Sequence, residues 1–499
     1  MQHRLPSILA CLAVVAVAAP ARPAVAQQAA TETPALQQQL NEWFRRAARA
    51  APGEWGVAVA NQNGQLLWAV NPTKPLIPAS TVKIFTTGFA RTTLGANARQ
   101  VTRVLGTGYV DPNGTWAGTW ALEVNGDPTL ERPTRSGPML HDLATQLADR
   151  GVKRLAGPLS IQSAQGEATT RFPDSWSPKH RGRRFAPLIG AVTLNENLIS
   201  FTIAPGRVGT PPRVVASAPD GVAELVEIKA KTVTGRRDRL RILPQPGGRY
   251  LVTGTIGVGR RGRTYGGPTS NPRAVLEAAW AAALRGAGID WSRGPALSGA
   301  DGRVTGRQTL AEVVSAPFDS IAHEINTRSL NIGAEALLEW AAGPTADAAR
   351  RLTEHVRQIT GDNLGVTLVD GSGLSSLDRA SPLTFVTYLA RMPTTPGGRN
   401  FALLLPAAGS GTLRKLGSGV PAPGVVHAKT GTLGNSSTLV GYLGHKDGML
   451  LISVMYNGPR VYAAKSQQWK LFRTLGAQGT IIPSDSVEAE LGGEGVPPN

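Results

Sequence analysis

Hydrophobic residues recur at helical and strand spacing in two parts of the 499-residue chain, one near each end. Leu36, Leu40, Trp43 and Phe44 lie three or four positions apart, which is typical of an amphipathic helix. Two short apolar runs on either side of a polar turn at 61–64 predict a hairpin. Near the N-terminus we therefore expect helices over 35–50 and 79–93 and strands over 55–60 and 66–70.

The C-terminal part shows the same mixture of helices and strands. Apolar residues at helical spacing return after residue 320, and a second polar turn joins two strand-like runs near residue 446. The predicted helices span 320–341, 346–359, 382–391 and 461–475, and the predicted strands span 425–430, 437–443 and 450–456. Both ends of the chain would thus supply helices and a hairpin to one sheet, which indicates a fold of the α/β (α+β) class.

The middle of the chain, residues 99–304, has a different pattern. Strand-like runs alternate there with turns rich in Gly and Pro, and helical spacing is found over 138–150 and 271–287. The strand-like runs span 101–110, 115–124, 194–203 and 250–256. Such a connection is far longer than two neighbouring helices need. We interpret 99–304 as an inserted, mostly β module of two small domains, within a catalytic domain formed by residues 27–98 and 305–482.

Residues 1–26 are typical of a secretory signal peptide. His3 and Arg4 precede an apolar run over 8–19, and Ala24-Val25-Ala26 has the pattern of a cleavage site. The run is too short for a membrane-spanning helix, although an uncleaved anchor is the alternative. We expect secretion across the inner membrane to the periplasm or another extracytoplasmic part of the cell envelope, with no transmembrane segment after signal removal.

Composition and charge narrow the possible chemistry. Cys11, inside the predicted signal, is the one cysteine, so the mature chain would have no thiol for catalysis, disulfides or thiolate metal sites. The acidic residues 483–499, rich in Gly and Pro, are predicted to be disordered. The formal net charge of +18 would ordinarily suggest nucleic acid as a partner. Because a secreted protein would not meet nucleic acid, we expect anionic envelope polymers instead, or simply a soluble arginine-rich surface.

Three short motifs contain residues that could form a serine acyl-transfer site. They occur once each, in the order Ser80-Thr81-Val82-Lys83, Ser329-Leu330-Asn331 and Lys429-Thr430-Gly431. None of the seven His residues has an obvious catalytic-triad context, and a Ser–Lys pair is a known substitute for Ser–His–Asp. Each motif alone is common by chance, whereas the ordered triple is specific.

Ser80 and Lys83 are the candidate nucleophile and general base. With Ser80 at the start of a helix, Lys83 lies one turn later on the same face, so the two side chains can meet. The helix N-terminus and further positive charge lower the pKa of such a lysine toward a value useful for a base. The backbone N–H groups of Ser80 and Thr432 could stabilise an oxyanion. The alternative is a helix cap beside a solvated lysine.

The other two motifs would complete this site. Ser329 and Asn331 are predicted to lie inside the helix that follows residue 320, where Ser329 would relay a proton and Asn331 would bond a substrate amide. A polar cap or a loop before the helix is the alternative. Lys429 and the Thr430 hydroxyl suit a terminal carboxylate. Gly431, on a strand edge, would let a peptide substrate pair with the backbone.

Charged residues outside the motifs have structural interpretations. Glu196 does not fit the deacylating glutamate pattern of class A β-lactamases and is expected in a turn, and Arg328 is expected to be solvated. The basic runs 179–184 and 236–241 are expected to form a solvated face rather than a ligand site. Because the sequence contains no HExxH motif, Cys/His cluster, P-loop or dinucleotide fingerprint, no metal and no organic cofactor are expected.

With four further segments, the chain resembles the serine D-alanyl-D-alanine carboxypeptidase/endopeptidases, the low-molecular-mass class C penicillin-binding proteins. The segments are 125–130 (Asn-Gly-Asp-Pro-Thr-Leu), 191–197, 370–375 (Asp-Gly-Ser-Gly-Leu-Ser) and Leu405-Pro406 with Gly411-Thr412-Leu413. The resemblance covers nearly the whole mature chain, but Leu330 departs from it, because a polar residue is common there. It implies the penicillin-recognising β-lactamase/transpeptidase-like sandwich, an antiparallel sheet between helices, with a largely β inserted module.

The resemblance also implies an activity and roles for residues. Ser80 would form the acyl-ester with Lys83 as general base, Ser329 and Asn331 would form the second element, and Lys429 with Thr430 would hold the substrate carboxylate. The expected substrates are peptidoglycan stem peptides ending in D-Ala-D-Ala, with D,D-endopeptidase cleavage as a second activity and β-lactam antibiotics as acylating inhibitors. A β-lactamase with the same Ser–Lys chemistry and a non-catalytic peptidoglycan-binding scaffold are the alternatives.

Overall fold

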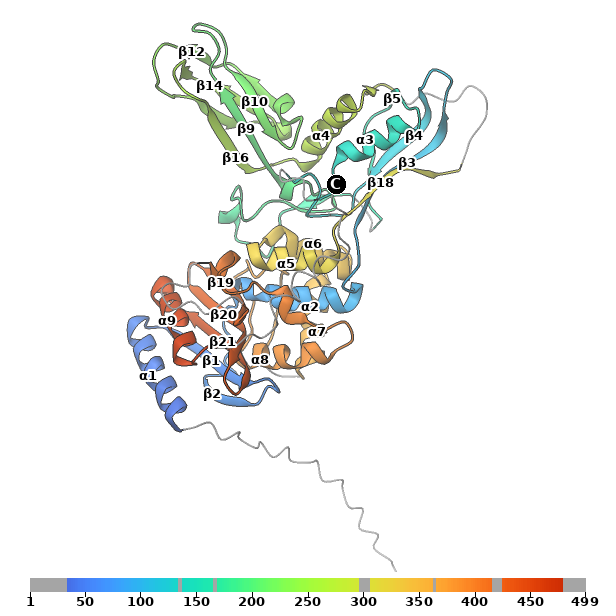
Figure 1. Ribbon diagram of the computed structural model, residues 1–499. Coiled ribbons are helices and arrows are strands. Elements are labelled where there is room, and N and C mark those ends of the chain that lie inside the picture. The colour runs from blue at the N-terminus through green and yellow to red at the C-terminus, as the bar shows by residue number, and fades with distance from the viewer. Residues whose placement is uncertain are drawn as a thin grey trace, which may run out of the picture.

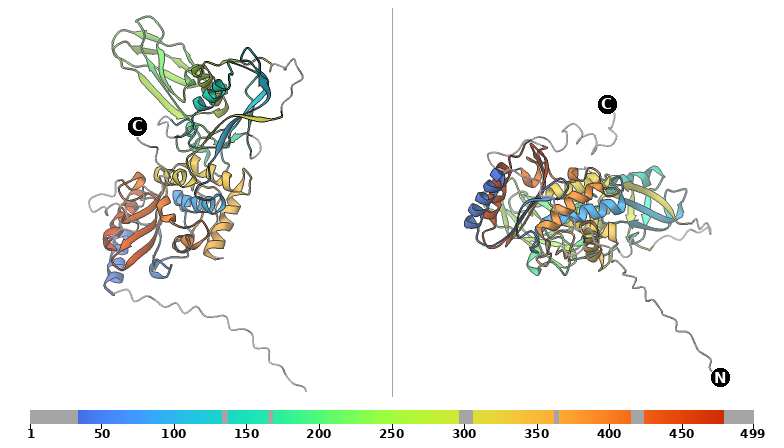
Figure 2. Two further views of the ribbon diagram at one scale, coloured as in Figure 1. Left: turned by 45° about the vertical axis from the view of Figure 1, so that its right-hand side comes forward. Right: turned by 90° about the horizontal axis from the view of Figure 1, so that it is seen from below.

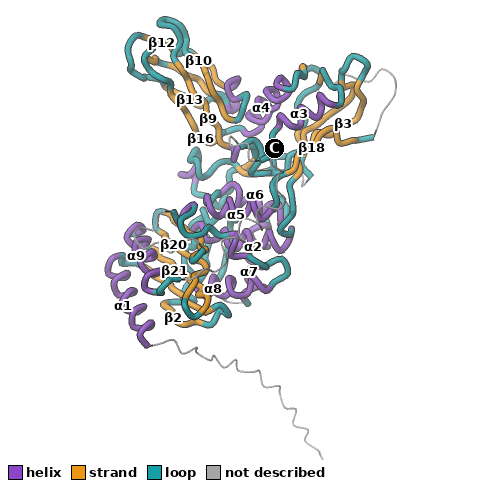
Figure 3. Tube along the Cα trace, viewed as in Figure 1, coloured by secondary structure: helices purple, strands orange, loops and turns teal. Residues whose placement is uncertain are grey.

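The computed structural model describes residues 34–132, 137–164, 168–295, 306–361, 365–414 and 424–478. The predicted signal peptide and the tail at 483–499, predicted to be disordered, lie outside these residues. In the described part, a helix-covered sheet built from both ends of the chain carries an elongated region built from its middle (Figure 1, Figure 2). Helices gather around this sheet, whereas strands and loops dominate the elongated region (Figure 3).

The main sheet is antiparallel and joins strands from both ends of the chain. Its strand order is β19-β20-β21-β1-β2, and β1 pairs with β21 along its whole length, so that Val57 lies opposite Val454. The two predicted hairpins are confirmed. The strands are β1 (Glu54–Asn61), β2 (Leu66–Val70), β19 (Val426–Leu433), β20 (Ser436–His445) and β21 (Gly448–Asn457).

Helices cover both faces of this sheet (Figure 1). On one face, α1 (Pro34–Ala50) and α9 (Val461–Thr474) share a buried core with the sheet that includes Trp43 and Leu471. On the other face, Phe85 of α2 stacks against Phe385 of α8, with ring centroids 4.5 Å apart. The helices on this second side are α2 (Val82–Leu94), α5 (Phe318–Arg328), α6 (Asn331–Ala342), α7 (Ala348–Thr360) and α8 (Pro382–Arg391).

The single helix predicted over 320–341 is wrong, because the structure has two helices there. Ser329 has the left-handed backbone angles φ 57° and ψ 45°, so α5 ends at Arg328 and α6 begins at Asn331. The N–H of Leu330 donates to Ile325 O at 3.0 Å, a bond typical of a helix C-terminus. Apolar spacing continues through the break because both helices bury residues in one core.

The middle of the chain forms two lobes beyond α5 and α6 (Figure 1). The first lobe contains a sheet of order β18-β3-β4-β6 and helix α3. Strand β18 belongs to this sheet although it lies beyond residue 304, where we expected the inserted module to end; the division into domains stays a prediction. The elements are β3 (Val101–Val110), β4 (Trp116–Glu123), α3 (Leu140–Asp149), β5 (Arg154–Ala156), β6 (Ile161–Gln162), β17 (Asp290–Ser292) and β18 (Gln308–Val314).

The second lobe is built from small sheets of orders β10-β9-β16, β11-β14-β13 and β12-β15. The strand predicted over 250–256 is divided between two of these sheets at Gly254, where φ is +92° and an added Cβ would lie 2.2 Å from Arg239 O. The strand predicted over 194–203 begins only at Leu198, because residues 195–197 have positive φ. The strands are β9 (Leu198–Ala204), β10 (Arg213–Ala218), β11 (Val226–Ile228), β12 (Lys231–Val233), β13 (Arg241–Pro244), β14 (Tyr250–Thr253), β15 (Thr255–Gly257) and β16 (Arg263–Pro268), and a separate pair is β7 (Thr170–Arg171) with β8 (Ile189–Gly190).

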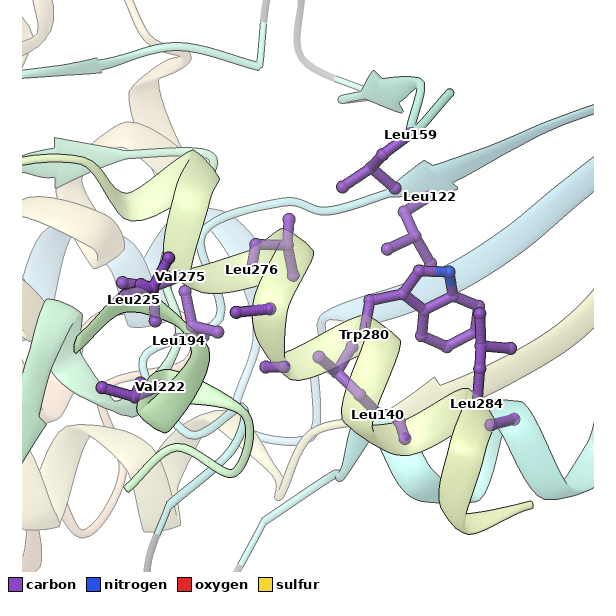
Figure 4. Packing of buried hydrophobic residues seen from close by; sticks show 14 of the residues in the cluster. Leu122, Leu140, Leu159, Leu194, Val222, Leu225, Val275, Leu276, Trp280 and Leu284 are labelled. Carbon is purple, nitrogen blue, oxygen red and sulfur yellow. The ribbon is translucent and has the colours of Figure 1, made fainter. Parts of the chain in front are cut away.

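Helix α4 (Pro272–Gly286) joins the cores of the two lobes. Its Trp280 is fully buried and lies near Leu122 of the first lobe, whereas Val275 lies near Leu225 of the second (Figure 4). All four residues belong to one continuous cluster of buried side chains. The two lobes therefore share a hydrophobic core and form one support beside the part of the chain that holds the main sheet.

Candidate active site

Ser80 lies at the start of α2, as predicted, in the 3-10 helix η1 (Ala79–Thr81) that leads into it. Ala79 has φ 50°, a left-handed conformation that is costly for a residue with a Cβ. Gly373 packs directly on this turn, since an added Cβ there would lie 1.9 Å from Ala79 O and 3.1 Å from Ser80 N. The surrounding backbone therefore holds Ser80 in a strained turn.

Lys83 is fully buried beside Ser80. Its Nζ lies 3.2 Å from Ser80 Oγ and donates to Asn331 Oδ1 and to Ser372 O, each at 2.7 Å. Asn331 donates from Nδ2 to Phe185 O at 2.8 Å, which turns Oδ1 toward the lysine. A neutral amine has two N–H groups and one lone pair. The two short bonds use both N–H groups and leave the lone pair for Ser80.

Ser329 lies at the break between α5 and α6 rather than inside a helix. Its Oγ accepts a hydrogen bond from Lys429 Nζ at 2.9 Å. This bond joins the second and third motifs, just as the bond between Lys83 and Asn331 joins the first and second. Because the backbone is left-handed at Ser329, the end of α5 brings Ser329 to Lys429 and the start of α6 brings Asn331 to Lys83.

Lys429 and Thr430 lie on β19, which forms an edge of the main sheet. The N–H of Ala428 donates away from β20, to Pro406 O at 3.1 Å. Successive N–H groups alternate in direction along a strand, and β19 pairs with β20 without a bulge. The N–H groups of Thr430 and Thr432 therefore face the open edge beside the serine.

Gly431 is required by the close approach of β19 to η1. An added Cβ would lie 2.1 Å from Thr438 Oγ1, 2.7 Å from Pro78 O and 3.0 Å from Ala79 Cβ. These distances are too short for any side chain. The glycine of the third motif thus places Lys429 and Thr430 against the turn that carries Ser80.

Burial lowers the pKa of both site lysines. The pKa of Lys83 falls from 10.5 to about 8, mainly through loss of hydration. Three carboxyl groups oppose this fall, namely Asp370, Glu335 and Asp378. The pKa of Lys429 is well below its usual value because of burial and then the charge of Lys83. Sequence reasoning named only the helix end and nearby positive charge as causes, and burial is the larger one.

The segment 370–375 forms the support beneath Lys83, a role that sequence reasoning missed. One Asp370 oxygen accepts from the N–H groups of Ser372 at 3.1 Å and Gly373 at 2.6 Å, and the other accepts from Ser375 N at 2.8 Å. This carboxylate folds the loop so that Ser372 O meets Lys83. An Asp followed by Gly-Ser-Gly is a signal for such a turn and could have been used.

Glu335 and Trp176 hold the same loop from two other parts of the chain. Both carboxylate oxygens of Glu335, on α6, lie 3.2 Å from Gly371 N. The indole Nε1 of Trp176, in the inserted region, donates to Asp370 Oδ2 at 3.1 Å. Glu335 follows Asn331 by four positions, so it lies on the same helix face and could have been recognised. No local sequence signal indicates Trp176.

Glu196 and the exposed Arg328 form an ion pair. Glu196 lies in a turn, as expected, but it is buried, and its carboxylate pairs with the guanidinium of Arg328 at 2.6 Å. Arg328 also pairs with Glu324 at 2.6 Å, and its side chain stays 44% exposed, so it is solvated as expected but also ion-paired. These groups adjoin a pocket of about 240 Å³ that Ser329 and Asn331 also line. The inserted region therefore forms one wall beside the second motif.

In the described part of the chain, no three His, Cys, Asp or Glu side chains are arranged to hold a metal ion. Within the same residues, no helix has the length and hydropathy needed to cross a membrane.

Relatives in sequence cover most of this chain. The profile of the D-Ala-D-Ala carboxypeptidase 3 (S13) family matches residues 36–474. The D-alanyl-D-alanine carboxypeptidase of Actinomadura sp. (strain R39) is 27% identical over 458 residues, which are 88% of this chain and 84% of that protein. A carboxypeptidase of Mycobacterium tuberculosis is 29% identical over 404 residues, 78% of this chain and 72% of that protein.

Solved structures confirm the expected fold class. Penicillin binding protein 4 from Haemophilus influenzae superimposes with a TM-score of 0.67 and 21% identity, over 87% of this chain and 99% of that chain. A complex of that protein with a novel β-lactam gives a TM-score of 0.62 at 22% identity, with the same coverage. The mixed α+β architecture is thus that of penicillin-binding proteins. Because the family profile spans both ends of the catalytic part and the whole insertion, the chain is a hydrolase that belongs to the D-Ala-D-Ala carboxypeptidase 3 (S13) family.

Proposed function

We propose that this chain is a serine-type D-Ala-D-Ala carboxypeptidase that acts on peptidoglycan stem peptides through an acyl-enzyme on Ser80, and that it also cleaves D,D-cross-links. The observation that carries the proposal is the set of hydrogen bonds that joins all three motifs at one end of α2. Burying two lysines against serine hydroxyls costs stability, and groups buried at such a cost are typical of functional sites.

Acylation begins with removal of a proton from Ser80. The uncharged Lys83 amine accepts that proton, and Ser80 Oγ attacks the carbonyl carbon between the two D-Ala residues. The carbonyl oxygen becomes an oxyanion, which the N–H groups of Ser80 and Thr432 stabilise. The outward direction of the Thr432 N–H supports this role. A pKa of Lys83 near 8 supports its role as the base, because roughly a tenth of the amine is then uncharged at pH 7.

The substrate peptide would lie along β19 as an added strand. Its terminal carboxylate is held by Lys429 and the Thr430 hydroxyl, and carboxylate binding favours the charged form of that lysine. Asn331 donates one N–H of Nδ2 to Phe185 O, and its second N–H donates to the substrate amide. Ser329, bonded to Lys429, relays a proton to the nitrogen of the departing D-Ala. Water then hydrolyses the acyl-enzyme.

Covalent labelling tests the nucleophile. Benzylpenicillin should add its mass to the purified protein, and Ser80→Ala should abolish the adduct. Ser376→Ala, an exposed serine after the loop under Lys83, is the matched control and should keep the adduct. An adduct that persists in Ser80→Ala would reject the assignment.

Digestion of purified muropeptides, followed by mass spectrometry, tests the reaction. Loss of one D-Ala from pentapeptides identifies the carboxypeptidase, and splitting of cross-linked dimers identifies the endopeptidase. A β-lactamase would instead turn over nitrocefin much faster than a D-Ala-D-Ala peptide. A scaffold would sediment with peptidoglycan and release no D-Ala. Accumulation of the protein in the extracytoplasmic fraction of cells, with residues 1–26 removed, would support the proposed secretion.

A further inference from the structure

The second lobe of the insertion carries a concentration of positive charge. Residues 204–268 contain twelve Lys and Arg against four Asp and Glu, a formal excess of eight positive charges out of the +18 of the whole chain. All of these residues lie in the described part of the structure. This stretch, about an eighth of the chain, therefore carries nearly half of the formal net charge.

Three segments of this lobe meet at its far end. The N–H of Thr232 in β12 donates to Thr210 O at 2.8 Å, and the N–H of Val258 donates to Val233 O at 2.8 Å. Strand β12 thus ties the loop before β10 to the turn after β15. This end of the lobe lies farthest from α2 and its serine (Figure 1).

The surface formed by these segments is called the basic tip here. Two valines of the tip are about half exposed, Val208 with 52% of its surface exposed and Val258 with 46%. The cations around them are exposed, and none makes an ion pair or a side-chain hydrogen bond with the described residues, since the Asp238 carboxylate is occupied by Arg260 and Arg263. These unpaired cations are Arg207, Lys231, Arg236, Arg237 and Arg261.

The chemistry of the tip discriminates between possible partners. A second copy of the chain would bring like charges together, which is unfavourable. A soluble phosphate polymer would bind the cations but would leave the two valines in water. An anionic bilayer offers phosphate groups to the cations and an apolar boundary to the valines. Basic surfaces with exposed apolar residues bind bilayers in this way.

We propose that the basic tip binds the surface of a bilayer that contains anionic phospholipids. Such binding would hold the catalytic part of the chain away from the lipid, because the main sheet and its helices lie on the far side of the insertion from the tip (Figure 1). This inference does not rest on the proposed catalytic function, because no residue of the tip belongs to the three motifs.

Vesicle sedimentation tests the proposal. The full chain should sediment with vesicles of phosphatidylcholine containing one quarter phosphatidylglycerol, but not with phosphatidylcholine alone, and salt should weaken binding. Arg236→Ala with Arg237→Ala should lower the partition constant about 25-fold, since each cation near such a surface contributes about fivefold. Val208→Ser with Val258→Ser should lower it several-fold on vesicles, but should leave binding to soluble polyphosphate unchanged.

The matched control is Arg45→Ala with Arg46→Ala, which removes two exposed, adjacent arginines from α1. This variant should bind vesicles as tightly as the unchanged chain. Thermal unfolding of each variant checks that it has folded. Equal losses in both arginine pairs would show that net charge alone acts and would overturn the proposal. Binding to polyphosphate without binding to vesicles, or no effect of the valines on vesicles, would overturn it as well.

Discussion

Trp176 of the inserted region donates a hydrogen bond from its indole Nε1 to Asp370 Oδ2 of the catalytic part, over a distance of 3.1 Å. Asp370 accepts from Ser372 N, and Ser372 O accepts from Lys83 Nζ. A side chain of the insertion is thus connected to the candidate base through three hydrogen bonds. The insertion therefore shapes the site as well as standing beside it.

The Trp176→Phe substitution should slow acylation of the protein by benzylpenicillin. Phenylalanine keeps an aromatic ring in the buried cluster that contains Ile332 and Leu374, but it removes the donor to Asp370. A buried hydrogen bond to a charged group is worth roughly 1.5–3 kcal/mol, so the loop under Lys83 should loosen. We expect about a tenfold decrease in the second-order acylation rate constant, which corresponds to about 1.4 kcal/mol.

Trp120→Phe is the matched control for this experiment. The Trp120 indole also donates to a buried acceptor, Ala156 O at 2.7 Å, but in the core of the two lobes. It should lower the melting temperature without changing the acylation rate of the folded protein. If the two variants lost acylation rate equally, the link from Trp176 to Lys83 would have no special role.

Acylation should follow the ionisation of Lys83. Burial lowers its pKa from 10.5 to about 8, and only the uncharged amine can accept the proton of Ser80. The acylation rate constant should therefore rise about tenfold per pH unit below pH 8 and level off above it. Rapid-mixing measurements with a chromogenic β-lactam from about pH 5.5 to 9.5 would check this. A profile that is flat over the range would contradict the role of the lysine.

The Gly431→Ala substitution should separate β19 from the turn that carries Ser80. The new methyl group would lie 2.1 Å from Thr438 Oγ1 and 2.7 Å from Pro78 O, so strand and turn must move apart. Overpacking of this kind destabilises a protein by about 1–3 kcal/mol. We expect a lower melting temperature and a loss of acylation by at least about a hundredfold, because small misplacements of reacting groups are costly.

Gly434→Ala provides the comparison, since an added Cβ at Gly434 meets nothing within 4 Å. It lies in the turn that follows β19, only three residues further along the chain. Its melting temperature and acylation rate should stay close to those of the unchanged protein. A mild phenotype for Gly431→Ala, equal to that of Gly434→Ala, would show that the close approach does not matter.

The sequence predicted the main sheet well because its hairpins have local signals. The polar turns at 61–64 and 445–448 each lie between apolar runs, and a hairpin needs nothing more distant. The break at Ser329 could not be predicted in this way. Its left-handed conformation accompanies a bond to Lys429, one hundred positions later in the chain, while the apolar spacing continues on both sides.

The motifs identified side chains that the structure brings together, but they did not identify the support beneath them. Trp176 and Asp370 are separated by 194 positions, so their contact depends on how the whole insertion folds back. The lowered pKa of Lys83 has the same origin, because burial is a property of the packed molecule. Sequence spacing could place Lys83 beside Ser80, whereas its environment required the tertiary structure.

The Glu335→Gln substitution should stabilise the protein at alkaline pH and change little at acidic pH. Burial, followed by the charge of Asp370, raises the pKa of Glu335 from 4.5 to about 8. Between pH 4.5 and pH 8 the folded protein keeps the proton of Glu335, whereas the unfolded chain has lost it. The free energy of unfolding therefore falls as the pH rises from 4.5 toward 8.

Glutamine has no charge to bury, and its Oε1 can still accept from Gly371 N. Urea unfolding at about pH 5 and pH 8.5 should show a difference between variant and unchanged protein that widens by on the order of 4 kcal/mol. Glu354→Gln, on the exposed side of α7, should show no such widening, and an equal effect of the two substitutions would mean that Glu335 is ionised throughout this range.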